Sequence, residues 1–334
     1  MNSPKTAVLT LSTVLLAFPA FATTLSQPDR IDDARALINH GDFNRARALL
    51  EPLSPGKQEI EAWFLLGKLS YLSGEIDQAV EFLEKASKGK PDSSQHFLWL
   101  GRALGRKAEQ ASPFRAPFLA RQAHNAFRTA VDLDPNDLDA RDDLLSYYLD
   151  APGFLGGGKE KAAALVDEIK DRHPCDYLVQ LAQIRVQEKS FEQAETALQK
   201  AAALNPPCSA GVLALAEFYQ DKKNANRARE IWLKAVQVFP ESPSAHFEFG
   251  RFEIESGGNL ESGRREMEAF LKLYSSGNPY PFEAYYWLGE LFLKLNQPAE
   301  AIGKFEKALS LFAAHSLSQK GLAEARQQMK NQRK

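Results

Sequence analysis

The chain has 334 residues, of which 44% are apolar and 25% charged. This composition can supply a sizeable core and excludes an intrinsically disordered chain of low hydrophobicity. The formal net charge is −2, with both signs spread along the sequence, so no concentrated positive charge points to phosphate binding. We therefore expect a globular protein without a nucleic-acid partner.

The first 22 residues, MNSPKTAVLTLSTVLLAFPAFA, have the pattern of a secretory signal peptide. Lys5 precedes an apolar run over residues 7–18, and a proline and small residues follow it. An uncleaved anchor is the alternative, but the run is shorter than the ~20 apolar residues that a spanning helix needs. We predict cleavage after Ala22 and an exported, periplasmic and soluble protein without a transmembrane segment in the mature chain.

The remaining sequence repeats with a period near 34 residues. In each unit an apolar helix contains a small residue. An aromatic or apolar residue lies four positions before it, and another lies immediately before it. These small residues include Gly67, Gly101, Ala182, Ala216 and Gly250. A second helix follows with two alanines seven positions apart, as at Ala79 and Ala86. Small residues at these places allow two helices to pack closely, so each unit is predicted to be a helical hairpin.

The segment from Trp63 to Pro91 resembles the tetratricopeptide repeat, with Leu66, Gly67 and the two alanines also at motif positions. The resemblance extends over residues 23–334 as a single domain of about eight units. These units lie near residues 27–56, 60–93, 94–137, 138–174, 175–208, 209–242, 243–281 and 282–315, followed by a capping helix at 318–332. The resemblance implies an all-α, right-handed superhelical solenoid that is elongated, with first helices on its concave side.

Three units depart from the repeat period, two of them in the first half of the chain. About ten extra residues surround the stretch AEQASPFRAPFLA, where Pro113 and Pro117 are expected to break the helix. A later unit, after Asn259, ends in SSGNPYPF at residues 275–282, which we predict to be a wide turn. Departures of this kind mark loops that can have a local function.

The second early departure is APGFLGGGKEKA, in which Gly153 to Lys159 fits the spacing of a phosphate-binding loop. Such a loop follows a β-strand and has Ser or Thr after its lysine, whereas here a predicted helix precedes it and Glu160 follows. We predict an interhelical turn with left-handed glycines. A binding loop formed by Pro152, Phe154 and Leu155, or a nucleotide-dependent activity at Gly153 to Lys159, is the alternative.

The two cysteines, Cys175 and Cys208, lie 33 residues apart at nearly equivalent places in successive units. An oxidising compartment permits a disulfide between them. Packed units are displaced by about 10 Å, however, and bridged Cα atoms usually lie within ~7 Å. Both the bridged and the free state stay open at this stage.

The sequence offers little that points to catalysis or to a cofactor. The six histidines are scattered and have no metal-ligand spacing, and neither cysteine has a nucleophile signature. Acidic stretches such as RDDLLSYYLD are typical of a solvated helix face. We expect a non-catalytic protein with no metal and no cofactor.

The resemblance places a partner-binding groove on the first helices, at positions 5 and 9 and near their ends. The candidate groove residues are Phe64, Lys68, Tyr71, Leu98, Arg102, Asp142, Gln183, Glu217, Phe247, Arg251, Tyr286 and Glu290. Rings and guanidinium groups are common interface anchors, so Arg102 and Arg251 are expected to bind a protein or peptide segment with acidic and aromatic residues. The alternative for each ring is packing against neighbouring helices.

These features predict an exported scaffold or adaptor that binds a protein or peptide in its concave groove during assembly of an envelope complex. An envelope module that binds glycan or exopolysaccharide through aromatic groove residues is the alternative.

Overall fold

The computed structural model describes residues 27–53, 59–277 and 279–332, and within these ranges every regular element is a helix. The predicted signal peptide and its cleavage site lie outside the described residues. The helices are α1 (Gln27–Asn39), α2 (Phe43–Leu50), α3 (Glu59–Leu72), α4 (Ile76–Gly89), α5 (Ser94–Gln110), α6 (Ala116–Leu133), α7 (Leu138–Asp150), α8 (Lys159–Asp167), α9 (Pro174–Gln187), α10 (Phe191–Ala202), α11 (Ser209–Asp221), α12 (Ala225–Val238), α13 (Pro243–Ser256), α14 (Leu260–Leu273), α15 (Pro281–Lys294), α16 (Pro298–Leu311) and α17 (Ser316–Gln332). Two short 3₁₀ helices, η1 (Glu51–Leu53) and η2 (Gly153–Leu155), complete the description.

Consecutive helices pack in pairs, from α1 with α2 to α15 with α16, and α17 packs on α16 and α15. The predicted all-α solenoid of eight hairpins and a final helix is confirmed for the described residues. Each hairpin also packs on the next, which buries an apolar core that continues through the chain of hairpins.

The small residues of the repeat lie where the two helices of a hairpin approach most closely. A Cβ atom at Gly67 would lie 2.6 Å from Leu83 Cγ on α4. A Cβ atom at Gly250 would lie 3.1 Å from the backbone oxygen of Gly263 and 3.2 Å from the backbone nitrogen of Met267. The glycines therefore set the spacing of paired helices.

Leucine at Gly250 is expected to lower the free energy of unfolding by about 1–3 kcal/mol, because the backbone of α14 leaves no room for the larger side chain. The matched control is Gly303→Leu, since a Cβ atom at this exposed site on α16 meets nothing within 4 Å. Leucine there should be neutral or slightly stabilising through helix propensity. Denaturant unfolding measures both variants, and equal stabilities would contradict the assigned helix contact.

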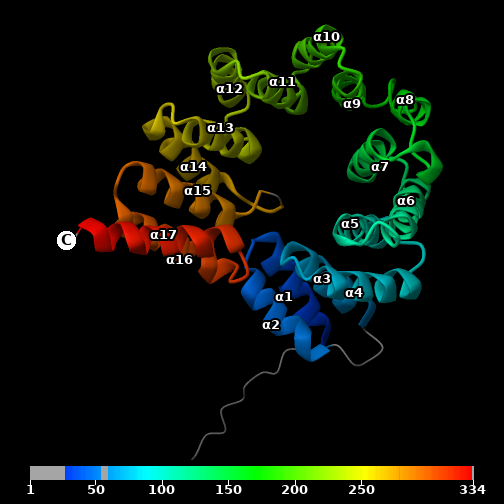
Figure 1. Ribbon diagram of the computed structural model, residues 1–334, viewed down its shortest axis with the longest axis horizontal. Coiled ribbons are helices and arrows are strands. Elements are labelled where there is room, and N and C mark those ends of the chain that lie inside the picture. Colours follow the sequence, from blue (N-terminus) through cyan, green and yellow to red (C-terminus); the bar gives the residue numbers. More distant parts are fainter. Residues whose placement is uncertain (1–26, 54–58, 278, 333–334) are drawn as a thin grey trace, which may run out of the picture.

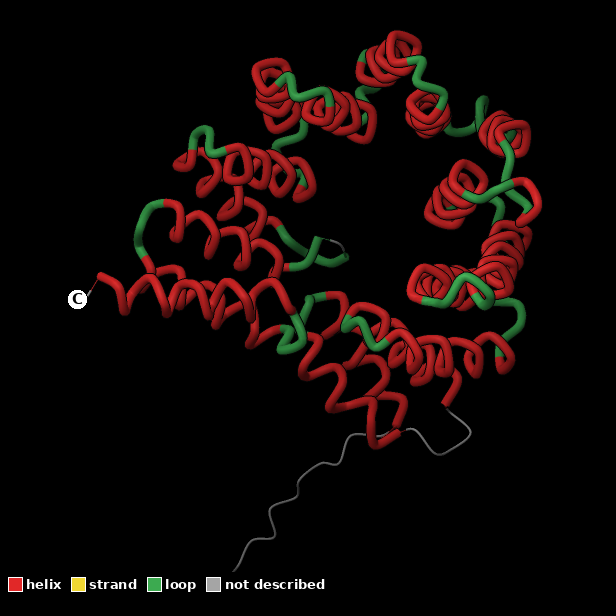
Figure 2. Tube along the Cα trace, viewed as in Figure 1, coloured by secondary structure: helices red, strands yellow, loops and turns green. Residues whose placement is uncertain are grey.

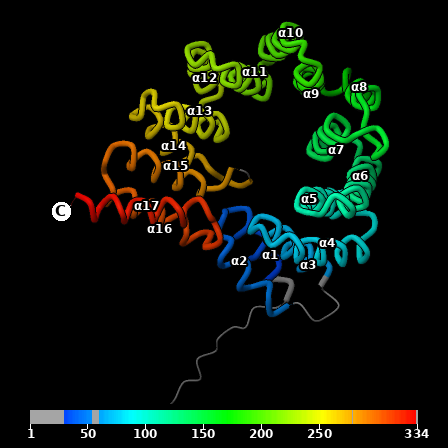
Figure 3. The backbone as a smooth tube through the Cα atoms, viewed as in Figure 1, coloured from blue at the N-terminus to red at the C-terminus, as the bar shows by residue number. Residues whose placement is uncertain are grey.

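The hairpins curve into a closed ring in which the first and last hairpins meet (Figure 1). The blue helices α1 and α2 lie beside the orange and red helices α15 to α17, and the tube drawings show the same arrangement (Figures 2 and 3). The expectation of an elongated solenoid with free ends was wrong. Small rotations between successive hairpins add up until the two ends touch.

Aromatic packing closes the ring. Phe43 at the start of α2 is buried, and its ring centroid lies 4.8 Å from that of Tyr280, 5.3 Å from that of Phe282 and 5.1 Å from that of Phe312. Gly41 has φ +75° and lies so close to Pro281 that an added Cβ would stand 2.9 Å from Pro281 Cδ. Only glycine combines this left-handed backbone with such an approach without strain.

Hydrogen bonds accompany this apolar contact. The side-chain amide of Asn44 donates to the carbonyl oxygens of Leu309 and Ser310, both at 3.0 Å, and its oxygen accepts from the backbone N–H of Ala313 at 2.8 Å. The loop after α14 contributes from the other side. There the backbone N–H of Gly277 donates to the carbonyl oxygen of Asn39 at 3.2 Å. The predicted wide turn near residues 275–282 is thus part of the ring closure.

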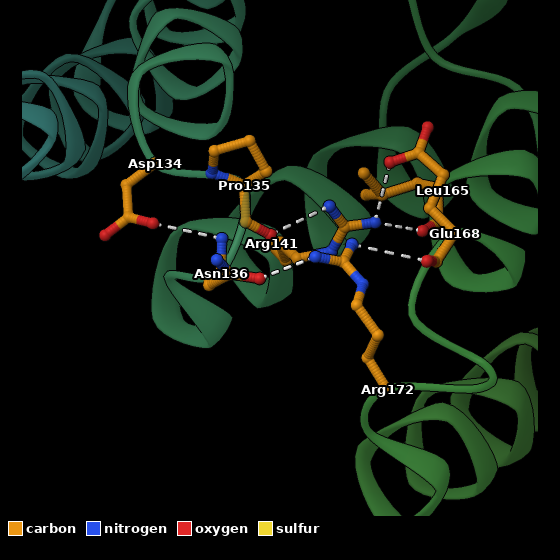
Figure 4. Close-up of polar contacts among 7 residues, drawn as sticks. All are labelled: Asp134, Pro135, Asn136, Arg141, Leu165, Glu168 and Arg172. Carbon is orange, nitrogen blue, oxygen red and sulfur yellow. Dashed lines mark hydrogen bonds and ion pairs between the residues drawn. The ribbon is translucent and has the colours of Figure 1, made fainter.

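The hairpin of α7 and α8 is held by a buried arginine (Figure 4). The side chain of Arg141 is fully buried, and it donates to the carbonyl oxygens of Pro135 and Leu165 and, at 2.9 Å, to the carboxylate of Glu168. Arg172 donates to the side-chain oxygen of Asn136 at 2.7 Å. These contacts fix the end of α8 against the turn between α6 and α7, which compensates for the shortness of α8.

Candidate partner-binding surface

The first helices of the central hairpins face the interior of the ring. In Figure 1, α5, α7, α9 and α11 lie on the inner side, and α6, α8, α10 and α12 lie on the outer side. This arrangement agrees with the expectation that first helices form the concave wall. The side chains that project from these helices therefore decide what the interior can bind.

One cavity of about 350 Å³ lies between α7, α9 and α11. The predicted groove residues Gln183 and Glu217 line it, together with Asp150 and Asp221. The apolar side chains that line it are Leu149, Val179, Ala182, Val186, Leu198, Ala214 and Phe218. An apolar lining with a few polar groups is typical of a binding site.

A second cavity of about 420 Å³ lies between α3, α5, α6 and α7. The predicted residues Tyr71 and Arg102 line it, and Ser146 and Asp150 line both cavities. The two cavities thus adjoin along α7, and we call them together the inner-wall groove. It follows the first helices from α3 to α11.

The arginines that were expected to bind acidic partner residues already have intrachain partners. Arg102 Nε lies 2.5 Å from the carboxylate of Asp143. Arg251 lies 2.5 Å from the carboxylate of Glu248 and 3.4 Å from that of Glu255. The expectation of an acidic partner segment therefore loses its basis, because these guanidinium groups are neutralised inside the protein.

The charged side chains of the inner-wall groove that form no ion pair within the described residues are acidic, and one of them, Glu217, is partly compensated by the nearby Arg251. The other arginine of the groove, Arg106, pairs with Glu109 at 3.1 Å. The carboxylates of Asp150, Glu217 and Asp221 form no ion pair and accept no side-chain hydrogen bond within the described residues. The groove therefore offers free negative charge above an apolar surface.

Carboxyl groups on this wall are harder to ionise than usual. Desolvation raises the pKa of Asp142 to about 6, against the hydrogen bond from Gln180, and the carboxylates of Asp139, Asp176 and Asp143 raise it further. Desolvation, and after it the neighbouring carboxylate of Glu248, also raises the pKa of Glu217. A cation in the groove would relieve this repulsion.

Two predicted groove residues are part of the core. Leu98 is fully buried and Phe247 is 3% exposed, with its ring centroid 5.2 Å from that of Phe270. Their assignment to a partner-binding surface was wrong, and the alternative of packing between helices is correct for them. Phe64 is half-buried and stacks on His96 at 4.6 Å. A large side chain at position 5 of a first helix therefore packs against the following hairpin.

The remaining predicted residues lie outside the two cavities. Lys68 and Arg102 lie over the ring of Trp99, at 4.8 Å and 4.9 Å from its centroid. Tyr286 packs against Trp287 and Phe305, and Glu290 is half-buried on the same helix, α15. Of these residues, Arg102 also lines the second cavity, whereas Lys68, Tyr286 and Glu290 line neither cavity.

Sequence reasoning missed Asp150, Val186 and Asp221, which line the groove near the ends of α7, α9 and α11. They lie three or four residues after position 9 of the first helix in each unit. Asp150, for example, lies four residues after Ser146, which is at position 9 of its unit. The repeat pattern contains this signal, because residues spaced by three or four share a helix face.

The glycine loop is a rigid turn, with a helix before it. Gly156 and Gly158 have positive φ values of +100° and +143°, as predicted. The backbone N–H groups of Leu155, Gly156, Gly157 and Gly158 all donate to carbonyl oxygens of residues 148–153. A phosphate-binding loop needs such N–H groups free, so the geometry does not support the nucleotide alternative.

Cys175 and Cys208 form a disulfide, with their Cα atoms 6.4 Å apart. Cys175 lies in the first turn of α9, and Cys208 directly precedes α11. The separation of about 10 Å used in the sequence argument describes packed helix axes, and the ends of two helices can approach more closely. The bridge joins two first helices that carry the inner-wall groove.

Models of the tetratricopeptide repeat match residues 31–94, 176–208 and 282–315. The chain contains tetratricopeptide repeats. The three matches fall on α1 to α4, on α9 and α10, and on α15 and α16. Tetratricopeptide repeats serve as scaffolds for protein–protein interaction, so a protein partner is the general expectation for this surface.

Several solved structures resemble the chain. A tetratricopeptide repeat protein from Parabacteroides merdae is 16% identical and aligns over 80% of this chain and 99% of its own, with a TM-score of 0.42. A thermophilic repeat protein of Thermus thermophilus is 17% identical over 74% of this chain and 100% of its own, with a TM-score of 0.41. A chain of the APC/C hetero-tetramer Cut9–Hcn1 is 15% identical and aligns over 91% of this chain and 71% of its own, with a TM-score of 0.45.

No functionally curated protein matches the sequence. Among the described residues, no helix combines the length and apolar character needed to cross a membrane.

Proposed function

We propose that this protein is an exported, non-catalytic tetratricopeptide scaffold of the cell envelope, and that its inner-wall groove binds a protein segment carrying lysine or arginine. One observation carries the proposal: the free charges of the groove, on Asp150, Glu217 and Asp221, are all negative. A cationic side chain pairs with them, while its apolar neighbours cover the exposed apolar lining.

The electrostatics of the wall support this choice of partner. Desolvation, and after it the carboxylate of Glu248, raises the pKa of Glu217, which lines the groove. A bound lysine or arginine stabilises the ionised form of such groups and so gains binding free energy from repulsion that already exists. An acidic segment would add to that repulsion.

The glycan alternative has less support. Stacking of a sugar needs an open aromatic face, and Lys68 and Arg102 already lie over Trp99, the half-buried tryptophan of α5. Phe64 is likewise stacked on His96. A protein segment, which can use charge and apolar contact together, suits the inner-wall groove better.

The disulfide supports the export part of the proposal. Disulfides persist in the periplasm and other oxidising compartments and are rare in the cytosol. The bridge between Cys175 and Cys208 therefore agrees with the signal-peptide pattern at the start of the chain.

Charge reversal in the groove tests the proposed partner. A peptide of alternating lysine and leucine should bind the protein, and a peptide with glutamate in place of lysine should not. Changing both Asp150 and Glu217 to lysine should weaken binding of the lysine peptide about tenfold or more, because two attractive charges become repulsive. Fluorescence anisotropy of the labelled peptides measures these affinities.

The matched control reverses two exposed glutamates on outer helices, Glu192 on α10 and Glu300 on α16, neither of which forms an ion pair with another residue that the structure describes. This variant should bind like the parent protein. The affinity should also fall as the pH decreases from 7.5 to 5, since desolvation raises the pKa of Glu217 in the groove and this carboxylate loses charge at low pH. Equal binding of both peptides, or an equal loss in both double variants, would refute the groove assignment.

A further inference from the structure

The later of the two early departures from the repeat period packs on α6, the helix that directly follows the earlier one. One is the connection from α5 to α6, at residues 111–115, and the other is the loop from α7 to α8, at residues 151–158. Arg121 on α6 donates to the carbonyl oxygen of Phe154 at 3.4 Å. Gly156 lies against His124, also on α6, such that an added Cβ would be 3.0 Å from the imidazole ring.

Three phenylalanine side chains at this place are exposed to solvent. Phe114 is 96% exposed, Phe118 is 65% exposed and Phe154 is 71% exposed. No other described phenylalanine is among the exposed large apolar residues. Phe114 precedes α6, Phe118 lies in its first turn, and Phe154 lies in the loop that packs on α6. Single exposed apolar residues are ordinary, whereas several exposed rings around one helix are typical of an interaction site. We call Phe114, Phe118, Phe154, Arg115 and Arg121 the loop patch.

The fold holds the loop that carries Phe154 in place. Tyr147 donates its hydroxyl to the carbonyl oxygen of Leu155 at 2.8 Å, and the ammonium of Lys161 donates to the carbonyl oxygen of Gly156 at 2.7 Å. At Gly157 an added Cβ would lie 1.8 Å from the backbone oxygen of Ala151. The exposure of Phe154 therefore belongs to a built, rigid turn.

Three exposed cations lie beside the rings, while the carboxylates of Asp150 and Glu160 flank the loop that carries Phe154. Arg115 and Arg121 are exposed, and neither forms an ion pair with a carboxylate within the described residues. Lys161, also exposed, binds only the carbonyl oxygen of Gly156 and lies over the ring of Tyr148. Protruding rings beside unneutralised cations are complementary to an anionic lipid surface, where rings enter the interface and cations meet headgroups.

We propose that the loop patch docks this protein on the surface of an anionic lipid bilayer. Neither cavity of the inner-wall groove is lined by any of the three rings, although Pro152 and Leu155, from the loop that carries Phe154, line the second cavity. The proposal is independent of the groove assignment, because it rests on different residues. It gives a role to the exposed phenylalanines of two neighbouring repeats that both carry expanded connections.

Vesicle sedimentation of the chain from Thr23 to Lys334 tests the proposal. The protein should sediment with vesicles of equal parts phosphatidylglycerol and phosphatidylcholine, and not with phosphatidylcholine alone. High salt should release it, because salt screens the cationic contribution. Changing Phe114, Phe118 and Phe154 to serine should lower the bound fraction about tenfold or more, as should changing Arg115 and Arg121 to glutamate.

The control is a double change of Leu295 and Leu317 to serine, since these leucines are 43% and 50% exposed elsewhere on the ring. It should bind vesicles like the parent. All changed side chains are solvent-exposed, so circular dichroism should show unchanged helicity. Absence of vesicle binding, or equal binding by the triple serine variant, would overturn the proposal. The proposal would also be overturned if light scattering detected a dimer that the triple serine variant does not form, while the parent protein did not bind vesicles.

Discussion

Replacing Phe43 by alanine is expected to open the ring. The side chain is 2% exposed and contacts Tyr280, Phe282 and Phe312 from the other end of the chain. Truncation of a buried phenylalanine usually costs about 3–5 kcal/mol, from lost apolar burial and the cavity that is left. Here the lost contact joins the first and last hairpins, so the two should separate while each stays folded.

Small-angle X-ray scattering measures this separation as an increase in the radius of gyration, and denaturant unfolding measures the loss of stability. The control is Phe249→Ala, since Phe249 is 1% exposed within the packed helices α9 to α13. It should cost a similar free energy without changing the radius of gyration under native conditions. If the Phe43 variant kept the scattering profile of the parent, the aromatic cluster would not be what closes the ring.

Loss of the disulfide is the second large effect we expect. The bridge between Cys175 and Cys208 spans 33 residues. Because a bridge of this span restricts the unfolded chain, replacing both cysteines by serine should lower the free energy of unfolding by about 3–4 kcal/mol. The transition midpoint in denaturant should fall accordingly.

Reductant provides the internal control for this prediction. Reducing the parent protein should lower its stability to that of the double serine variant, and the same treatment should leave the variant unchanged. Thiol labelling followed by mass spectrometry counts free cysteines in protein recovered from its native compartment. Two labelled cysteines in that protein would contradict both the bridge and the oxidising location proposed above.

The hairpin architecture was predictable because its cause is local. Gly67 and Gly250 are small where two consecutive helices touch, and the distance along the chain between the touching residues is short. The pattern therefore repeats in the sequence with the same period as the structure. The glycine turn at residues 151–158 was predictable for the same reason, since a helix precedes it and two of its glycines, Gly156 and Gly158, have positive φ.

The ring closure was not predictable, because it depends on contacts between residues far apart in the sequence. Phe43 and Phe312 meet only after the rotations between all intervening hairpins have been added. The repeat pattern in the sequence does not reveal the angles of those rotations. The approach of Cys175 to Cys208 depends on the geometry between hairpins in the same way. Local patterns determine each hairpin, whereas small angles accumulated along the chain determine the ring.

The candidate groove was predictable in position but not in charge. The repeat pattern placed Gln183 and Glu217 on the inner wall, and they line a cavity there. It could not show that Arg102 is neutralised by Asp143 on the next first helix, 41 residues away. Nor does the sequence distinguish the buried Leu98 from side chains that reach the cavity.

The contact between α2 and the last hairpin also affects how the molecule can deform. A solenoid with free ends behaves as a spring, because small changes at every interface between hairpins add up to a large change in pitch. Once Asn44 is hydrogen-bonded to Leu309 and Ser310, the distance between the two ends is fixed, and a bend at one interface must be cancelled at others. The curvature of the inner wall is then set before any partner arrives. A segment that fits this curvature binds without the cost of ordering the receptor, and one that requires a different curvature must first break the ring.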